Sequence, residues 1–253
     1  MKLRVLGCSG GIGDGRHTTA FLLDDDILLD CGSGVTTLSH AQLRAIDHVF
    51  LTHAHLDHIL SLPLLLDSVG AERGRPLTLH GLPEVLQTLK DHLFNWQIWP
   101  DFARIPTPEA PFLRYEPLRV GEPVRLGARE VTAVPARHVV PAVGYLLRGA
   151  DGGLLFSGDT AGHEAFWQLA NATPDLRHVV VECSFPDHLA AIAEASKHYC
   201  PQTLAADLRA ARAGAEVWIS HLKPGGEAAI MAELAGHGAT RARALRNGQV
   251  FEL

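Results

Sequence analysis

The chain has 253 residues, a formal net charge of −6, 47% hydrophobic residues and 20% charged residues, which is ordinary for a globular protein with a sizeable core. The small acidic balance argues against a protein that holds nucleic acid through a broad basic face. No stretch approaches the roughly 18 to 20 apolar residues of a membrane span, and glycines interrupt the N-terminal apolar run before a signal peptide could form, so we expect a cytoplasmic protein.

The first half of the chain begins with predicted strands and then mixes strands with helices. Two apolar runs flank the turn-like Asp24–Asp26 and predict a hairpin. The expected elements are strands at 2–7, 20–23, 27–32, 48–53 and 77–81, followed by a helix from about Pro83 to Phe94. The next segment, 95–112, is rich in proline and contains Trp96 and Trp99. It is too apolar for a disordered linker, which favours an ordered loop or lid.

The second half continues the same mixture. Strands are expected at 131–138, 178–184 and 216–221, with a hairpin over 144–159 and helices between the later strands. Tandem repeats, low-complexity tracts and shifts of composition are not found, so we predict a single domain over residues 1–253. The four cysteines are scattered without a CxxC pair, which favours reduced, buried thiols over a zinc ribbon or a disulfide framework.

Four of these predicted strands end at a residue that can bind a metal ion. The four residues are His53, His138, Asp159 and His221. Strands fix backbone positions while the loops after them are free to converge, and binding sites of open α/β sheets therefore collect at the carboxyl ends of strands. We expect these four side chains to meet at one edge of the fold.

The stretch 51–62, with the sequence LTHAHLDHILSL, concentrates polar residues within an apolar run. It places His53, His55, Asp57 and His58 at positions i, i+2, i+4 and i+5. A buried helix face would repeat at i, i+3 and i+4, so the spacing favours a tight polar turn between a strand and a helix. Histidine ligates metals and carries protons near neutral pH, and fifteen of the 253 residues are histidines.

Such a set of nitrogen and oxygen donors suits two divalent ions. Two cations about 3.5 to 4 Å apart can activate a water between them and clamp a displacement at phosphorus. We expect one ion to be held by His53, His55 and His138. We expect the other to be held by Asp57, His58 and His221. Asp159, with two carboxylate oxygens, is the expected bridge, and the donor types favour zinc, with manganese or iron as alternatives.

The segment THAHLDH resembles the HxHxDH signature of the metallo-β-lactamase superfamily, and His138, Asp159 and His221 follow in the order of that superfamily's remaining ligands. The resemblance runs from the glycine-rich LGCSGG and LLDCGSG to SHLKPG. It implies an α+β fold, an αββα sandwich of two mixed sheets flanked by helices, with a dinuclear metal site at one edge.

Finer features are similar to the class II cyclic-nucleotide phosphodiesterases. They are the segments HAHLDHI, FSGDT, ECSFPD, SKHYCP and SHLKP. One position departs from that pattern, because Pro63 stands where the family would have an aliphatic residue in the helix after the metal motif. The departure does not involve a metal ligand.

The same resemblance marks Glu182 and His198 as a catalytic pair. In phosphodiesterases of this superfamily a glutamate after a strand orients a histidine that protonates the leaving oxygen. The pairing is chemically sensible, because a ribose oxygen leaves poorly as an alkoxide and a histidine kept cationic by a carboxylate is a suitable general acid. Asp57 is expected to help orient the nucleophile as well as to bind metal.

Simpler explanations exist for the residues taken one at a time. His138 or His221 alone would be an ordinary histidine, Asp159 alone could be a turn or helix-capping residue, and His163 or His188 could compete with His198. The glycines between residues 7 and 15 fit neither phosphate-binding loop pattern and predict a tight loop after the first strand. Trp96 and Trp99 could stack on a base, although core or dimer packing is the simpler interpretation.

We therefore predict a metal-dependent phosphodiesterase that hydrolyses 3',5'-cyclic nucleotides (cAMP or cGMP) with a metal-bridging hydroxide as nucleophile. The expected partner is a small nucleotide, with no membrane and no nucleic acid, and a homodimer is left open. A tRNase Z-like endoribonuclease would use the same centre, but the net charge has the wrong sign for gripping RNA. A thioester or lactam hydrolase and a metal-dependent sensor without turnover are the remaining alternatives.

Overall fold

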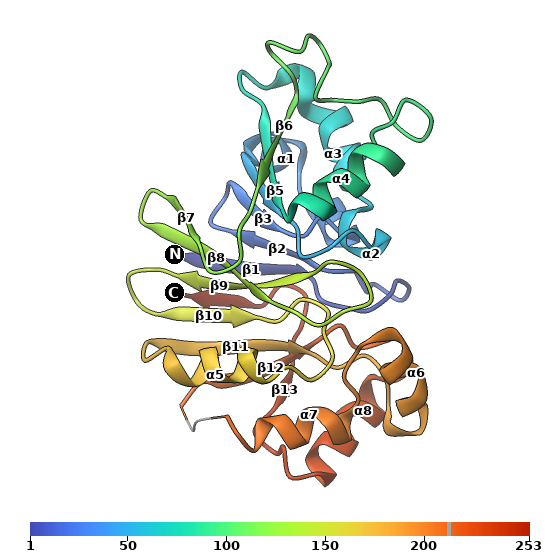
Figure 1. Cartoon of the computed structure of the whole chain (residues 1–253), viewed down its shortest axis with the longest axis vertical. Helices are drawn as coiled ribbons and strands as arrows, with labels where there is room; N and C mark the ends of the chain where they lie inside the picture. Colours follow the sequence, from blue (N-terminus) through green and yellow to red (C-terminus); the bar gives the residue numbers. More distant parts are fainter. Residues whose placement is uncertain (212–213) are drawn as a thin grey trace.

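The computed structural model describes residues 1–211 and 214–253 and places them in four layers, with helices outside two central sheets (Figure 1). This order confirms the predicted αββα sandwich of two mixed sheets. The strands of the first sheet are, in spatial order, β14 (Val250–Glu252), β1 (Lys2–Gly7), β2 (Ala20–Leu23), β3 (Ile27–Leu29), β4 (His48–Phe50), β5 (Leu77–Gly81) and β6 (Leu113–Pro117). Pairing is antiparallel from β14 to β3 and parallel from β3 to β6.

The second sheet repeats this division between antiparallel and parallel strands. Its strands are β13 (Arg243–Ala244), β12 (Glu216–Ser220), β11 (Leu176–Glu182), β10 (Gly153–Phe156), β9 (Val143–Arg148), β8 (Arg129–Pro135) and β7 (Pro123–Leu126). Strands β7 to β10 pair antiparallel and strands β10 to β13 pair parallel. Each sheet thus has a parallel half, whose strands are followed by loops at one edge.

Helices from the two halves of the chain cover opposite faces of the sandwich (Figure 1). The first sheet is accompanied by α1 (His40–Ala45), α2 (Leu56–Ile59), α3 (Leu62–Val69) and α4 (Pro83–His92), with short 3₁₀ turns η1 (Ser33–Thr37) and η2 (Gly70–Glu72). The second is accompanied by α5 (Glu164–Ala172), α6 (Ala190–Ser196), α7 (Pro201–Leu208) and α8 (Glu227–Gly236), with η3 (Asp187–Leu189). No helix within the described residues is long and apolar enough to cross a bilayer.

The core between the sheets explains why several strands are apolar throughout. Every residue of β2, β3 and β10 is buried, since one face of each strand meets the other sheet and the opposite face meets helices. Aromatic rings interlock across this layer, with Phe21 4.9 Å from Phe156 and Phe50 5.9 Å from Tyr145 between ring centroids. Each such buried side chain contributes roughly 1.5 to 3 kcal/mol relative to exposure.

Both predicted hairpins are present, as β2 with β3 and as β9 with β10. The expected ends of four strands are wrong by three residues, because β3, β4, β8 and β10 stop at Leu29, Phe50, Pro135 and Phe156. After β3, β4 and β10 the chain stays buried for three more residues, so burial does not mark where those strands end. After β8 it becomes partly exposed, and the strand ends with its ladder. His53, His138 and Asp159 therefore lie in loops rather than on strand termini.

The two prolines near helix starts are accommodated in the first turn. Pro83 opens α4, which ends at His92, two residues before the expected end. Pro63 is buried in the first turn of α3, after the short α2 has ended at Ile59. The first helical N–H groups have no partner within a helix, so proline costs little there.

The remaining expectations on loops and cysteines agree with the structure, except that core packing is wrong for Trp96. Segment 95–112 is an ordered loop in which Phe102 is buried, and Trp99 packs against the core beneath α4, whereas Trp96 is 59% exposed. All four cysteines are free and buried. The glycine-rich segment after β1 is a loop joined to the far end of the chain, because Gly10 N–H donates to Leu222 O at 3.0 Å.

Candidate metal centre

Four loops and the start of α2 bring all seven predicted ligands together. The loops follow β4, β8, β10 and β12, and each therefore leaves the sheets at the carboxyl end of a strand. His53, His58 and His221 are buried, and Asp159 is 3% exposed. The expected convergence of His53, His138, Asp159 and His221 at one edge is therefore what the fold produces.

The first donor group consists of His53, His55 and His138, whose candidate ligand atoms lie within 4.8 Å of one another. His138 Nε2 faces His55 Nδ1 at 3.2 Å. On its other side, His138 Nδ1–H donates to Lys197 O at 3.2 Å, which leaves the Nε2 lone pair directed into the group. This grouping matches the set expected for one ion.

The second donor group consists of Asp57, His58, Asp159 and His221, again with ligand atoms within 4.8 Å. Asp57 Oδ2 lies 3.8 Å from His58 Nε2 and 3.6 Å from His221 Nε2. The Asp57 side chain is partly open to solvent, whereas the other three side chains are buried. The group therefore has one open side, from which a small molecule can approach.

Asp159 lies between the two groups. Its Oδ2 atom is 3.7 Å from His53 Nε2 in the first group and 3.4 Å from His58 Nε2 in the second. Its Oδ1 atom is 3.2 Å from His221 Nδ1. A carboxylate in this position can contribute an oxygen to both groups, which is the geometry expected of a bridging ligand.

The buried nitrogens test whether divalent ions fit this site. His53 Nε2, His58 Nε2 and His221 Nδ1 are buried and make no hydrogen bond, although all three point toward Asp159. Buried polar atoms are nearly always satisfied, and three unpaired imidazole nitrogens around one carboxylate are costly without a further partner. Borderline divalent cations prefer this donor set, so the residues present fit the ions.

A buried aspartate orients two of the histidines. Asp30 Oδ2 accepts from His58 Nδ1–H at 2.7 Å, and Asp30 also accepts from the Thr52 hydroxyl at 2.8 Å. The Thr52 hydroxyl hydrogen is thereby used, so its oxygen accepts from His53 Nδ1–H at 3.0 Å. Both rings are held with Nδ1–H donating and Nε2 directed toward the donor groups, as is usual for ligating histidines. Neither Asp30 nor Thr52 was assigned from the sequence, although Asp30 lies in the LLDCGSG segment.

Burial and neighbouring charges set the protonation of these groups. Burial lowers the pKa of His138 to about 4 and that of His221 to about 3. Both rings are therefore neutral at pH 7 and have a lone pair available for a metal ion. Burial would raise the pKa of Asp159, but the charges of His221 and His58 hold it well below its usual range. Burial would lower the pKa of His58, but Asp159 and Asp30 raise it, so a cation at Nε2 would displace a proton.

Two structural features keep His221 in place. Its backbone has φ of 57°, a left-handed conformation that non-glycine residues rarely adopt, and its N–H donates to Cys8 O at 2.7 Å. Gly10 packs directly against its ring, since a Cβ atom there would lie 2.8 Å from His221 Cδ2. The tight loop after β1 thus requires glycine where it supports a donor.

Glu182 and His198 lie beside the two donor groups and are in contact. His198 Nδ1–H donates to Glu182 Oε1 at 2.7 Å, and Ser184 Oγ donates to Glu182 Oε2 at 2.9 Å while lying 3.0 Å from His198 Nδ1. Burial would lower the pKa of His198, but the Glu182 carboxylate raises it above the usual value. Ser184 was not assigned from the sequence, although it lies in the ECSFPD segment.

The pairing distinguishes His198 from the two histidines that could compete with it. The ligand atom of His198 lies within 4.8 Å of those of His138 and Asp159. His163 precedes α5 and His188 lies in η3, and within residues 1–211 and 214–253 neither belongs to a group of convergent donors. The role of His198 as an acid stays a prediction, but its position is that of a group able to reach the centre.

Comparison with known proteins places these features in a family. The model of the β-lactamase superfamily domain matches residues 26–235, which include all seven predicted ligands. The ribonuclease Z of Bradyrhizobium diazoefficiens is 31% identical over 144 residues, which are 54% of this chain and 46% of that protein. A probable 3',5'-cyclic-nucleotide phosphodiesterase of Yersinia pestis is 24% identical over 276 residues, covering 87% of this chain and 77% of that protein.

Solved structures show the same fold at low sequence identity. Yeast PDE1 superposes with a TM-score of 0.80 at 19% identity, covering 100% of this chain and 99% of that one. The short form of human tRNase Z gives a TM-score of 0.68 at 18% identity with the same coverage. Together, the four-layer fold, the convergent histidines and aspartates and the match over residues 26–235 establish that this chain belongs to the β-lactamase superfamily.

Proposed function

We propose that this protein is a metal-dependent phosphodiesterase that hydrolyses 3',5'-cyclic nucleotides. The observation that carries the proposal is the Glu182–His198 pair, with 2.7 Å between Oε1 and Nδ1, held beside the donor groups. Such a charged imidazole is needed when the leaving group is a poor one, as a ribose oxygen is. The relative from Yersinia pestis, a probable cyclic-nucleotide phosphodiesterase, matches 87% of the chain and supports the choice of substrate.

In this proposal the two donor groups hold two divalent ions, with zinc first among the candidates. The ions, when bound, supply an activated water and neutralise charge on the phosphoryl oxygens. Asp57, whose side chain is partly open to solvent, orients the attacking water. Asp159 keeps the two groups at a fixed separation, and Asp30 and Thr52 keep the His53 and His58 rings in the binding tautomer.

His198 then acts on the leaving group, on the side of the phosphorus opposite the attacking water. Its Nδ1–H is held by Glu182, so Nε2 carries the proton that passes to the leaving oxygen. Burial would lower the pKa of His198, but the Glu182 carboxylate raises it above its usual value and so favours the protonated ring. Glu182 is itself buried and anchored by the Thr160 backbone N–H at 3.0 Å, which fixes the direction of the ring.

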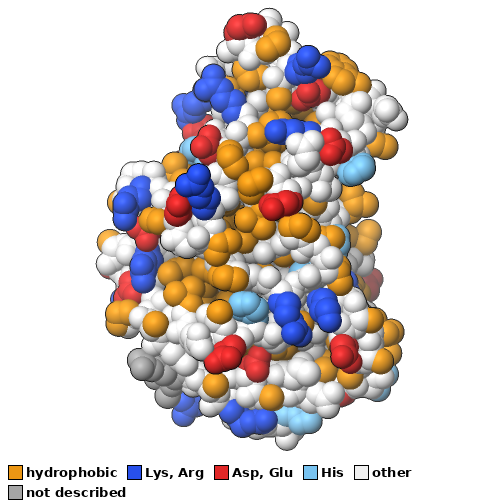
Figure 2. All heavy atoms as spheres, viewed as in Figure 1, with side chains coloured by type: hydrophobic (Ala, Val, Ile, Leu, Met, Phe, Trp, Pro, Cys, Tyr) orange, Lys and Arg blue, Asp and Glu red, His pale blue; other side chains and the backbone are white. Residues whose placement is uncertain are grey.

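A tRNase Z-like endoribonuclease is the second candidate, and one observation favours it: a ribonuclease Z shares 31% identity over 54% of the chain. Charge argues against it. The net charge is −6, and on the face shown in Figure 2 basic and acidic side chains are interspersed rather than gathered into a basic surface. Binding of RNA depends strongly on neutralising phosphates with Lys and Arg, so we rank the small substrate first.

A substrate panel on zinc-loaded protein separates these candidates. It should include 3',5'- and 2',3'-cyclic nucleotides, bis(p-nitrophenyl) phosphate, a precursor tRNA and a thioester. We expect turnover of the 3',5'-cyclic nucleotides with kcat/KM well above that for the thioester. Preferential cleavage of precursor tRNA would replace the first proposal by the second, and thioester turnover alone would refute both.

The role of His198 has its own test, based on the leaving group. His198→Ala should slow cyclic-nucleotide cleavage by on the order of 10² to 10⁴ while leaving metal content unchanged. The p-nitrophenolate of bis(p-nitrophenyl) phosphate leaves without protonation, so the variant should lose much less rate on that substrate. His188→Ala, which changes a histidine in η3, is the matched control. Equal losses on both substrates, with chemistry limiting in each, would show that His198 is not the acid.

A further inference from the structure

Lys223 places a positive charge close to the metal donors. Its Nζ atom donates to Gly10 O at 2.8 Å, and its backbone N–H lies 3.4 Å from Ser184 O. Gly10 is packed against His221, because a Cβ atom at Gly10 would lie 3.1 Å from His221 Nε2. The Lys223 ammonium is therefore connected to a candidate metal ligand, His221, through the Gly10 residue that it contacts.

Aromatic rings connect the same ammonium to the candidate acid. Lys223 Nζ lies 5.8 Å from the centroid of the Phe185 ring, and that ring meets the His198 ring at 5.7 Å and 66°. His198 in turn stacks on His221, with 5.5 Å between centroids and 17° between planes. Lys223 and Phe185 thus lie in a chain of ring contacts that leads to His198 and the candidate ligand His221.

The ammonium lacks a carboxylate partner in the part of the chain that the structure describes, residues 1–211 and 214–253. Gly10 O uses one of its three N–H donors, which leaves two for another acceptor. A part-buried ammonium with two unused donors, beside the candidate ligands and the candidate acid, points to a negatively charged ligand.

We propose that Lys223 binds a non-bridging phosphoryl oxygen of the substrate and of the phosphomonoester product, and thereby selects phosphate esters over neutral acyl substrates. The expected effect of Lys223 on turnover rests on the function proposed above. Lysine suits this task as a compact point charge with three donors, and a hydrogen bond to an ionised acceptor is stronger than one between neutral groups. Phe185 covers one face of the ammonium and limits its exposure to water.

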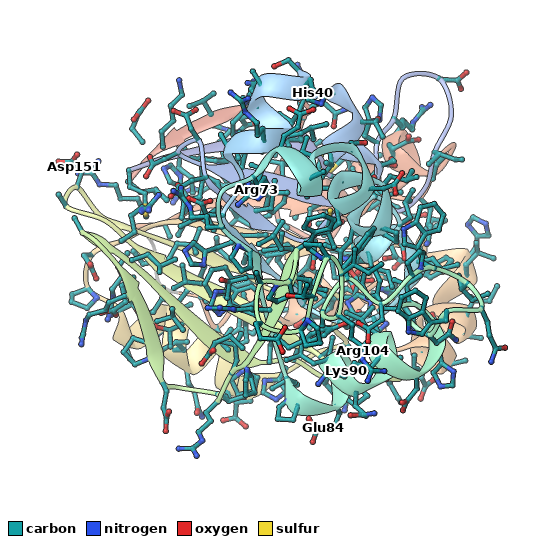
Figure 3. All side chains as sticks on the ribbon, turned by 90° about the horizontal axis from the view of Figure 1, so that it is seen from above. His40, Arg73, Glu84, Lys90, Arg104 and Asp151 are labelled. Atoms are coloured by element: carbon teal, nitrogen blue, oxygen red, sulfur yellow. The ribbon has the colours of Figure 1, made fainter. Side chains whose placement is uncertain are left out.

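The test uses inorganic phosphate as the probe on zinc-loaded protein, with binding measured by calorimetry. Lys223→Gln keeps a donor that can reach toward Gly10 O but removes the charge, and Lys223→Arg keeps the charge. Lys223→Met is a second uncharged variant should the glutamine variant fold poorly. Lys90→Gln is the matched control, because Lys90 lies on α4 with its ammonium 4.5 Å from the Tyr115 ring centroid (Figure 3).

We expect the Kd for phosphate to rise about tenfold in the uncharged variants and to stay near the original value in Lys223→Arg and Lys90→Gln, with two zinc ions bound in each. The KM for bis(p-nitrophenyl) phosphate should rise with little change in kcat. Unchanged phosphate affinity in the uncharged variants would overturn the proposal. Loss of zinc from them would also overturn it, since Lys223 would then act by holding Gly10 against His221. Phosphate binding needs no turnover, so this result is independent of which phosphodiester the enzyme cleaves.

Discussion

Replacing Asp30 by asparagine should weaken one metal site selectively. In the native protein Asp30 Oδ1 accepts from the Thr52 backbone N–H at 2.7 Å, and Oδ2 accepts from His58 Nδ1–H at 2.7 Å. The amide introduced by Asp30→Asn has one oxygen and one NH₂ group. If its oxygen keeps the Thr52 contact, the NH₂ group donates to His58 Nδ1 and the ring proton moves to Nε2, the atom that should bind metal.

The magnitude follows from these contacts. Loss of the partner that orients a metal-binding histidine costs about 10- to 100-fold in metal affinity. The second donor group, which contains His58, should show this loss. The first group should change little, because the Thr52 hydroxyl can donate instead to the retained amide oxygen at the Oδ1 position, 3.0 Å away, and so still accept from His53 Nδ1–H. The hydrogen bond that the substitution replaces joins two ionisable side chains, Asp30 and His58. The metal-free protein should therefore also lose about 1.5 to 3 kcal/mol in its free energy of unfolding.

A chromogenic zinc chelator in competition with the protein would resolve the two sites, and chemical denaturation would give the stability. Asp47→Asn is the control, because Asp47 pairs with Arg73, at 2.7 Å, and with Arg75 rather than with any metal donor. Two zinc ions bound with native affinity by folded Asp30→Asn protein would refute the assigned tautomer and with it the orienting role of Asp30.

Three further outcomes are expected. Asp159→Ala should remove both ions together, whereas His221→Ala should mainly weaken the second site; elemental analysis that finds two ions in Asp159→Ala would exclude the bridge. Chelation should abolish activity and added zinc or manganese should restore it, so activity in verified metal-free protein would contradict the mechanism. Burial, followed by the neighbouring His48, lowers the pKa of His80 to about 3. The unfolded state then binds the extra proton below pH 6.5, so stability should fall by roughly 3 kcal/mol between pH 7 and pH 4, and His80→Gln should flatten that slope in denaturation curves.

The ligand set could be predicted because each donor belongs to a short segment whose spacing is informative by itself. His53, His55, Asp57 and His58 are neighbours in the sequence, and their irregular spacing is enough to exclude a helix face. The distant donors could be added because each follows an apolar strand, and topology brings such ends to one edge.

The supporting residues could not be predicted in this way, since their roles depend on contacts across the fold. Asp30 reaches Thr52 and His58, which are 22 and 28 residues away. Ser184 meets His198 only because the helix α6 and the turn before it return the chain to β11. Strand ends were misplaced for a related reason: Leu51 is fully buried in a loop, and burial does not reveal where the paired ladder stops.

His198 shares a donor group with His138 and Asp159, so its geometry alone would allow it to bind a metal ion rather than to donate a proton. Its protonation decides between these roles, and Glu182 controls that protonation through the 2.7 Å contact at Nδ1. A cationic imidazole has no lone pair at Nε2 and repels a cation, so in the proposed mechanism we expect Glu182 to keep His198 acidic and also to keep excess metal away from it. Glu182→Gln removes the charge and keeps a hydrogen-bond acceptor, and it should allow a third zinc ion to bind at His198 when zinc is in excess. Elemental analysis should compare that variant with Glu182→Gln/His198→Ala. A third ion that the double variant retains, or that neither variant binds, would show that Glu182 does not determine whether His198 binds metal or donates a proton.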